Sequence, residues 1–177
     1  MRTVERLDIN NPEHAGFMFD LGNACQDDFL NDHQSDIILL MNEYDRRIRD
    51  GSVVAFLCKQ DGADIGIVWV EMDGFGVGRV RAGMMPEYRS GFTAAHFLRK
   101  FVDFCFRTLS LRKLDAEIVL YDKMNRGSKA AETLLRRFGF KKEGFLRESL
   151  MKGGRPRDTI LLGLTRNRFE GLKKHGK

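Results

Sequence analysis

The sequence predicts a single α/β domain in which a mixed, mostly antiparallel sheet carries helices on both faces. The chain has 177 residues, a length that suits one hydrophobic core better than two. Hydrophobic residues make up 42% and charged residues 31%, as in ordinary globular domains. The apolar pattern is first that of meandering strands, then changes to a helical period, and ends in a hairpin. This order places helical crossovers on a sheet that begins as a meander.

The first half of the chain is expected to form a short strand, two helices and three more strands. Asn11 is a suitable N-cap, and Pro12 a suitable first residue, for the first helix. Ser35 or Asp36 can cap the second helix, which ends at Gly51. The predicted strands are Val4–Ile9, Ser52–Cys58, Ile65–Met72 and Phe75–Met85.

The second half is expected to alternate helices with strands. Apolar residues follow helical spacing in Thr93–Leu109 and in Ser128–Phe138. A basic tail, Arg166–Lys177, ends the single predicted domain of residues 1–177. The predicted order is therefore β-α-α-β-β-β-α-β-α-β-β. Its last three strands are Leu114–Tyr121, Phe140–Met151 and Thr159–Thr165, with a turn at Lys152–Asp158.

Composition narrows the classes of function without selecting one. The net charge of +5 is compatible with a phosphate-rich cofactor, an acidic partner, nucleic acid, or no charged partner. Cys25, Cys58 and Cys105 are odd in number and form no C-x-x-C pair, which argues against a disulfide framework and against a metal site. The sequence shows no signal peptide and no apolar run near the ~20 residues of a membrane span. We therefore expect a cytoplasmic protein without a membrane partner.

Several motifs occur in order between Arg136 and Leu164, in the sequence RRFGFKKEGFLRESLMKGGRPRDTILLGL. This segment resembles the C-terminal pattern of the GNAT superfamily of N-acetyltransferases, in particular its RimJ/RimL-like branch. The order of predicted elements from Val4 to Thr165 is similar to that of the superfamily as well. Gly139 is expected to end a helix in a left-handed turn. The matching positions are Gly139-Phe140, Glu143-Gly144, Leu146-Arg147, Gly154-Arg155 and Asp158.

The resemblance implies that acetyl-CoA is the co-substrate and that its pyrophosphate lies on the turn before the Thr93–Leu109 helix. The superfamily pattern there is Q/R-x-x-G-x-G/A, and amide groups at the helix N-terminus bind the anion. In this chain Phe92 stands at the middle glycine, whereas a glycine, Gly91, precedes it. Either Gly91 takes that role in a shorter loop, or Phe92 occupies the place. The implied cofactor-binding residues are Met84, Met85, Arg89, Ser90, Gly91, Phe92, Thr93, Ala94 and Asn125.

Acetyl transfer to an amine needs a base for the amine and a proton donor for the departing thiolate. Glu117, on the Leu114–Tyr121 strand, is the first candidate base, and an exposed strand carboxylate is its alternative interpretation. Glu71 is the reserve candidate. Asn125 and Ser128 form an N-x-x-S sequence that resembles the RimJ/RimL-like motif, although the spacing differs, and Ser128 can instead cap its helix. Tyr121 is a further candidate hydroxyl, and the tyrosine of other superfamily members is replaced by Leu135.

The hypothesis is thus an acetyl-CoA-dependent N-acetyltransferase that acetylates a primary amine of a small molecule or a peptide. The substitutions at Phe92 and Leu135 and the irregular spacing of Asn125 and Ser128 also support an alternative, a GNAT-fold protein that has lost catalysis and serves as a binding or structural module. Nucleic-acid binding through the basic tail and Arg46-Arg47-Arg49 is a weaker alternative, because such tails are commonly solvated. A homodimer is compatible with the sequence. The glycines at 74, 76 and 78 predict a hairpin edge rather than a dinucleotide-binding loop.

Overall fold

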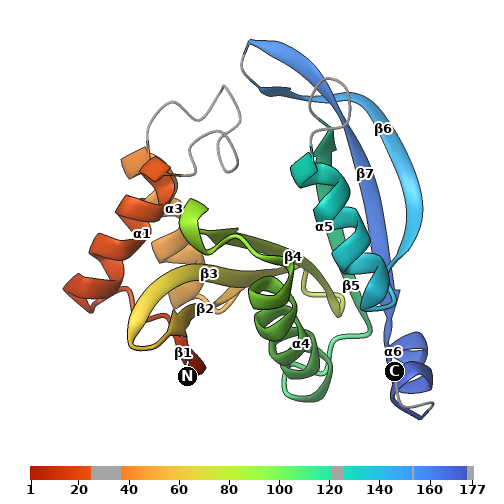
Figure 1. Cartoon of the computed structure of the whole chain (residues 1–177), viewed down its shortest axis with the longest axis horizontal. Coiled ribbons are helices and arrows are strands. Elements are labelled where there is room, and N and C mark those ends of the chain that lie inside the picture. The colour runs from red at the N-terminus through yellow and green to blue at the C-terminus, as the bar shows by residue number, and fades with distance from the viewer. Residues whose placement is uncertain (25–36, 121–125, 153, 175–177) are drawn as a thin grey trace.

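The computed structural model describes residues 1–24, 37–120, 126–152 and 154–174. It contains one seven-stranded sheet with strand order β1-β2-β3-β4-β5-β7-β6 (Figure 1). Neighbouring strands are antiparallel except for the parallel pair β4 and β5. The strands are β1 (Arg2–Arg6), β2 (Val53–Gln60), β3 (Ala63–Met72), β4 (Val77–Met84), β5 (Lys113–Leu120), β6 (Lys141–Lys152) and β7 (Arg155–Thr165). The helices are α1 (Pro12–Ala24), α3 (Ile37–Arg49), the 3₁₀ turn η1 (Pro86–Tyr88), α4 (Gly91–Arg107), α5 (Arg126–Arg137) and α6 (Arg166–Lys174).

The sheet separates two hydrophobic cores, as the predicted fold class requires. The larger core lies between the sheet and helices α4 and α5, and includes Phe101 and Phe140. The smaller core lies under α1 and α3 and includes Leu21 and Trp69. From Ile67 to Val70, successive residues of β3 alternate between the two cores, because side chains of a strand point to opposite faces in turn. The predicted mixed sheet and the predicted order of its elements are confirmed.

Local sequence signals correctly predicted several boundaries. Asn11 caps α1, since its Oδ1 accepts a hydrogen bond of 2.9 Å from the Glu13 amide. Gly139 follows α5 with φ of +92°, and a Cβ at this position would overlap the Leu172 side chain.

Cys58 and Cys105 are buried in the larger core, and burial raises the pKa of each thiol to about 12.

The C-terminal hairpin is longer than the sequence predicts. The segment Lys152–Asp158 was expected to be a turn, but β6 extends to Lys152 and β7 begins at Arg155. Pairs such as Met151 with Pro156 continue the ladder toward the tip, so Pro156 does not end the strand. Because Pro156 lies near a strand end, the missing amide hydrogen bond of proline is tolerated. The long hairpin forms one edge of the sheet (Figure 1).

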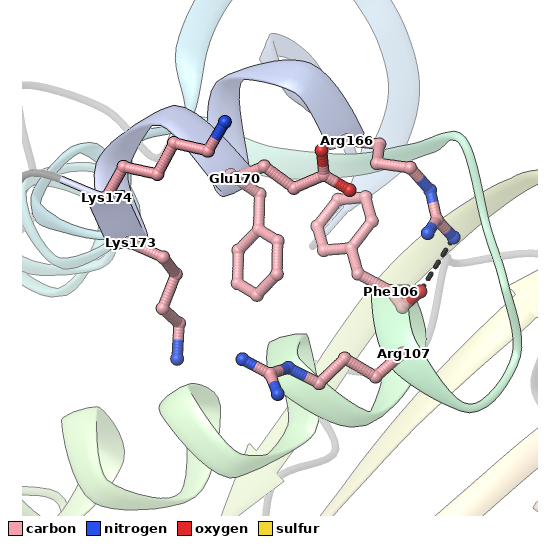
Figure 2. Close-up of a pocket in the computed structure, with 7 residues that line it drawn as sticks. Phe106, Arg107, Arg166, Glu170, Lys173 and Lys174 are labelled. Atoms are coloured by element: carbon pink, nitrogen blue, oxygen red, sulfur yellow. Dashed lines mark hydrogen bonds between the residues drawn. The ribbon is translucent and has the colours of Figure 1, made fainter.

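The expected basic tail is a folded helix over most of its length. In α6, the buried ring of Phe169 stacks on Phe106 of α4, with 4.7 Å between ring centroids. Arg166 donates hydrogen bonds to the carbonyl oxygens of Phe106 (2.6 Å) and Leu111 (2.8 Å), as Figure 2 shows for Phe106. Phe106 lies in the last turn of α4 and Leu111 follows the helix. The bonds from Arg166 therefore give partners to carbonyl groups that the helix itself leaves unpaired. Because most residues of this segment are basic or polar, its composition did not indicate that Phe169 attaches it to the core.

A hollow of about 370 Å³ lies between α4 and α6, away from the divergent ends of β4 and β5. Its cationic side chains include Arg107 and Lys173 (Figure 2). Both form ion pairs with Asp103, at 3.1 Å and 2.6 Å respectively. The hollow is therefore a surface feature of the α6 docking contact, in which a shared carboxylate partly neutralises the cations.

We predict that Phe169→Ala destabilises the protein, because it removes a buried ring that joins α6 to α4. Large-to-small changes of this kind cost about 3–5 kcal/mol in well-packed cores. Thermal unfolding should therefore show a clearly lower melting temperature. Glu170→Ala is the matched control, because the neighbouring Glu170 is exposed on the same helix. Equal melting temperatures for the two variants would contradict the docking of α6.

Candidate functional site

The candidate site begins where β4 and β5 separate. The two strands pair only from Val77 and Lys113 to Val80 and Ala116. Beyond that point β4 stays paired with β3 as far as Met84, while β5 stays paired with β7. Each strand follows its other neighbour, so the two diverge (Figure 1). The facing edges of β4 residues 81–84 and β5 residues 117–120 therefore form no ladder with each other, and such edges can bind an extended ligand.

A pocket of about 460 Å³ occupies this separation and reaches both faces of the sheet. On one face it is bounded by α4 and α5, including Phe97 and Leu135. On the other face it is bounded by α1 and α3, including Leu21 and Tyr44. Two ligands that enter from opposite faces can meet inside such a passage. Leu135, at the position of the superfamily tyrosine, contributes an apolar wall.

The turn before α4 is organised by Ser90, which is the N-cap of the helix. The Ser90 hydroxyl oxygen accepts a hydrogen bond of 3.1 Å from the Thr93 amide and lies 2.9 Å from the Thr93 hydroxyl oxygen. The Ala94 amide donates to the Ser90 carbonyl at 3.0 Å, which begins the helical hydrogen bonding. The amides of Gly91 and Phe92 thus lie in the first turn, where helices have no internal acceptor. They form the positive end of α4.

Phe92 does not obstruct the pocket. Its side chain is 73% exposed, and the Arg2 guanidinium lies 4.8 Å from its ring centroid. Neither Gly91 nor Phe92 has positive φ, and no atom lies within 4 Å of a Cβ built at Gly91. The backbone conformation of this turn therefore requires no glycine. Amide donors therefore lie at the start of α4 whether Gly91 or Phe92 takes the position of the glycine in the expected pattern.

Three other predicted cofactor-binding residues, Met84, Met85 and Arg89, form hydrogen bonds at the end of β4. Arg89 donates from Nε to the Met84 carbonyl at 2.9 Å, a contact that the sequence did not predict. The Met85 amide donates to the Ile65 carbonyl at 2.9 Å. Both bonds use backbone groups that were expected to face pantetheine. A ligand along this edge must therefore use other groups of β4, or replace the Arg89 contact.

Glu117 is the first residue of β5 beyond the paired segment, and it lines the pocket. Its side chain is 24% exposed, and its Oε1 lies 3.5 Å from Nη2 of Arg79. The expected carboxylate is thus present in the passage, in a weak ion pair.

Glu71, the reserve candidate base, is occupied by structural contacts. Its carboxylate accepts hydrogen bonds from Tyr44 Oη (2.8 Å), Trp69 Nε1 (3.3 Å) and Arg81 Nε (2.9 Å). Arg47 approaches its other oxygen at 3.4 Å. Burial favours a raised pKa for Glu71, but the charge of Arg81, hydrogen bonds from Tyr44 and Trp69 and the charge of Arg47 lower it overall. Burial and the Glu71 charge raise the pKa of Tyr44 to about 12, so its hydroxyl stays a donor.

Ser128 lies within the first turn of α5 and is not its N-cap, so the capping interpretation was wrong. The helix begins at Arg126, and the Ser128 hydroxyl donates to the Val119 carbonyl of β5 at 2.7 Å. This bond ties α5 to the separated part of β5. Tyr121 and Asn125, the other candidate proton donors, lie outside the described residues.

The sequence analysis missed two residues that line the pocket, Arg81 and Lys152. Arg81 is the first residue of β4 beyond its pairing with β5. Lys152 was placed in a turn, yet it ends β6 with a side chain only 5% exposed. The sequence signal that could have identified Arg81 is its spacing from Arg79, because residues two apart lie on the same face of a strand.

Other types of site receive no support from the described residues. Among them, no group of three or more His, Cys, Asp or Glu side chains is arranged to hold a metal ion. Within the same residues, every helix is too short or too polar to cross a membrane.

The fold is similar to solved structures of spermidine N-acetyltransferases from Vibrio cholerae. A structure of mutant forms of the spermidine/spermine N-acetyltransferase SpeG gives a TM-score of 0.80 at 18% identity, covering 97% of this chain and 98% of that chain. The enzyme in complex with CoA and spermine gives 0.79 at 19% identity, covering 96% and 98%. A dodecameric structure gives 0.77 at 18% identity, covering 95% of each.

The chain therefore has the fold of these GNAT superfamily members. The similarity gives no support to the narrower RimJ/RimL-like assignment, because the matched structures are spermidine acetyltransferases. No protein-family model matches the sequence, and no curated protein does.

We predict that Glu71→Gln lowers the free energy of unfolding by about 1–3 kcal/mol at pH 7, because two arginines lose their shared carboxylate. A lowered folded-state pKa stabilises the fold above the unfolded pKa, and this contribution is lost as pH falls through the folded value. The difference between wild type and variant should therefore shrink at acidic pH. Urea unfolding from pH 7 to pH 3, followed by Trp69 fluorescence, measures it. A difference that does not change with pH would count against this assignment.

Proposed function

We propose that this protein is an acetyl-CoA-dependent N-acetyltransferase that acetylates a primary amine by direct attack. The observation that carries the proposal is the passage through the sheet, with a helix N-terminus at one side and Glu117 within it. This arrangement lets a phosphate-bearing thioester and an amine approach from opposite faces. The fold shared with SpeG, one structure of which holds CoA and spermine, supports the same conclusion.

The residues around the turn before α4 supply the binding of the thioester co-substrate. The amides of Gly91 and Phe92 and the positive end of α4 hold its pyrophosphate, as helix N-termini hold phosphates generally. Ser90 and Thr93 keep this turn in shape through their mutual hydrogen bonds. Arg89 joins the turn to Met84, Met84 and Ala94 line the pocket, and Met85 continues the chain from β4 into the turn. The pantetheine arm lies in the separation between β4 and β5.

Glu117 accepts a proton from the acceptor ammonium, directly or through one water, and so frees the nitrogen lone pair. That nitrogen forms a bond to the thioester carbonyl carbon, and the carbon–sulfur bond then breaks. The nitrogen loses its second proton as the amide forms, and the sulfur leaves as a thiolate, which takes up one proton, so one proton in total passes through Glu117 to solvent. Of the proposed donors, Ser128 must leave the Val119 carbonyl to provide it, whereas Tyr121 and Asn125 lie in the segment 121–125. The products are an amide and CoA.

The alternative of a non-catalytic binding module loses one of its supports. It relied on Phe92 in place of a glycine, on Leu135 in place of a tyrosine and on the irregular spacing of Asn125 and Ser128, and a passage blocked by Phe92 would have favoured it. Phe92 points to solvent and does not line the pocket, so the passage stays open. Leu135 cannot donate a proton as a tyrosine could. An amine can still attack the thioester if another group protonates the departing thiolate.

We predict that millimolar acetyl-CoA raises the melting temperature by about 5–10 °C, the shift expected when a ligand is present at ~100 times its dissociation constant. Gly91→Pro should weaken binding about tenfold or more, because it removes one amide donor at a helix position where proline is tolerated. Ser90 is extended, with φ of −122° and ψ of 146°, so a following proline fits. Gly91→Ala keeps the amide and is the control. No stabilisation of the wild type would refute the proposed function.

We predict that Glu117→Gln lowers kcat by about 10²-fold or more, the usual contribution of a general base. Release of free thiol from acetyl-CoA in the presence of an amine measures the rate. Binding of acetyl-CoA by the variant should be unchanged, since Glu117 lies away from the turn before α4. Glu143→Gln is the matched control, because Glu143 forms an ion pair with Lys113 on the exposed part of β6. Equal rates for the two variants would exclude Glu117 as the base.

A further inference from the structure

We infer that the acceptor of this enzyme carries a carboxylate close to its amine, as an amino acid does, and is not a polyamine. This inference rests on the proposed function and names the substrate class of the same site. It depends on Arg81 and Glu117, two of the three charged side chains that line the pocket among the described residues.

Arg81 and Glu117 face one another where the strands separate. The ladder between β4 and β5 ends at Val80 and Ala116, so Arg81 and Glu117 are the next residues of their strands. Arg79 and Arg81 share a face of β4, and the contact of Arg79 with Glu117 places the carboxylate on that same face. Neighbouring strands lie ~4.8 Å apart, and these two have only begun to diverge. A small molecule can therefore contact both side chains.

Arg81 is oriented for binding an anion. Its Nε donates to Glu71 at 2.9 Å, and Glu71 is itself held by Tyr44, Trp69 and Arg47. The Arg81 side chain is nevertheless 39% exposed. Within the part of the chain that the structure describes, neither terminal nitrogen of its guanidinium has a hydrogen-bond partner. Arginine binds carboxylates through two parallel hydrogen bonds, and an arginine already fixed at Nε loses little entropy in doing so.

The charge balance of the passage disfavours a polycation. Each described carboxylate at the separation is matched by arginine, Glu71 by Arg81 and Arg47, and Glu117 by Arg79. One ammonium group of a polyamine can reach Glu117, but its further ammonium groups meet Arg81 and, among the described residues that line the pocket, no second carboxylate. An amine with a carboxylate places its ammonium at Glu117 and its anionic group at Arg81.

The experiment compares pairs of acceptors that differ only in the carboxylate. Thiol release from acetyl-CoA would be measured with the twenty amino acids, with their α-amides, with β-alanine and 4-aminobutyrate, and with spermidine, spermine and 2-aminoethyl phosphate. We expect the best amino acid to exceed its amide by about 10–100-fold in kcat/KM, as for one charge-assisted bidentate contact. Polyamines should be poorer substrates than that amino acid.

Substitutions of Arg81 test the assignment directly. Arg81→Gln should reduce the ratio of acid to amide to about threefold or less, mainly through KM, and Arg81→Lys should retain an intermediate ratio. Arg47→Gln is the matched control, because Arg47 also contacts Glu71 but does not line the pocket, and the ratio should be unchanged. If Arg81→Gln fails to fold, the Arg81→Lys ratio and the wild-type panel decide the question.

Two kinds of result would overturn the inference and leave the proposed function intact. One is acetylation of a polyamine, or of the amides, at least as efficient as that of any amino acid. The other is a preference for 2-aminoethyl phosphate over all carboxylates, which would replace the carboxylate by another anion. Absence of both acetyl-CoA binding and thiol release with every amine would instead refute the proposed function itself.

Discussion

The separation of β4 from β5 is the constraint on which the site depends. A sheet gains from complete pairing, since an unpaired and buried amide or carbonyl group is costly. Here each strand keeps a full ladder on its other side, β4 with β3 and β5 with β7, and the missing hydrogen bonds are confined to two short facing edges. The cost is limited, and the opening connects the two faces of the sheet. Without this divergence, α4 and α3 would face separate compartments.

Charge on the α3 face helps to keep the separation in place. The carboxylate of Glu71 joins α3 to β3 and β4 through Tyr44 and Arg81. On the other side of the opening, the Ser128 hydroxyl holds α5 to the Val119 carbonyl of β5. One contact therefore braces each of the diverging strands against a helix. The two bracing side chains were both considered as catalytic groups from the sequence, and for Glu71 the structural role explains its burial and its lowered pKa.

The fold could be predicted from local signals because each of them is decided within a few residues. The cap at Asn11 acts on an amide two positions away, and the left-handed Gly139 ends its own helix. The site could be predicted only in part, because its contacts join distant positions. Ser128 contacts a carbonyl nine residues earlier, on another element, and Tyr44 contacts the carboxylate of Glu71, 27 residues later. Segments such as the C-terminal helix were misjudged because charge dominated their composition and concealed Phe169.

At the turn before α4 the sequence departs from the GNAT-like pattern in its side chains, whereas what a helix N-terminus offers an anion is its backbone amides. A glycine is needed where φ is positive or where a Cβ would collide, and neither condition holds at Gly91 or Phe92. Phenylalanine at position 92 therefore places its ring in solvent while its amide keeps its place in the first turn of α4. The same reasoning does not extend to the part of the pocket that Arg81 and Glu117 line. There the side chains themselves carry the charge, so a substitution would change the pocket without any change in the backbone.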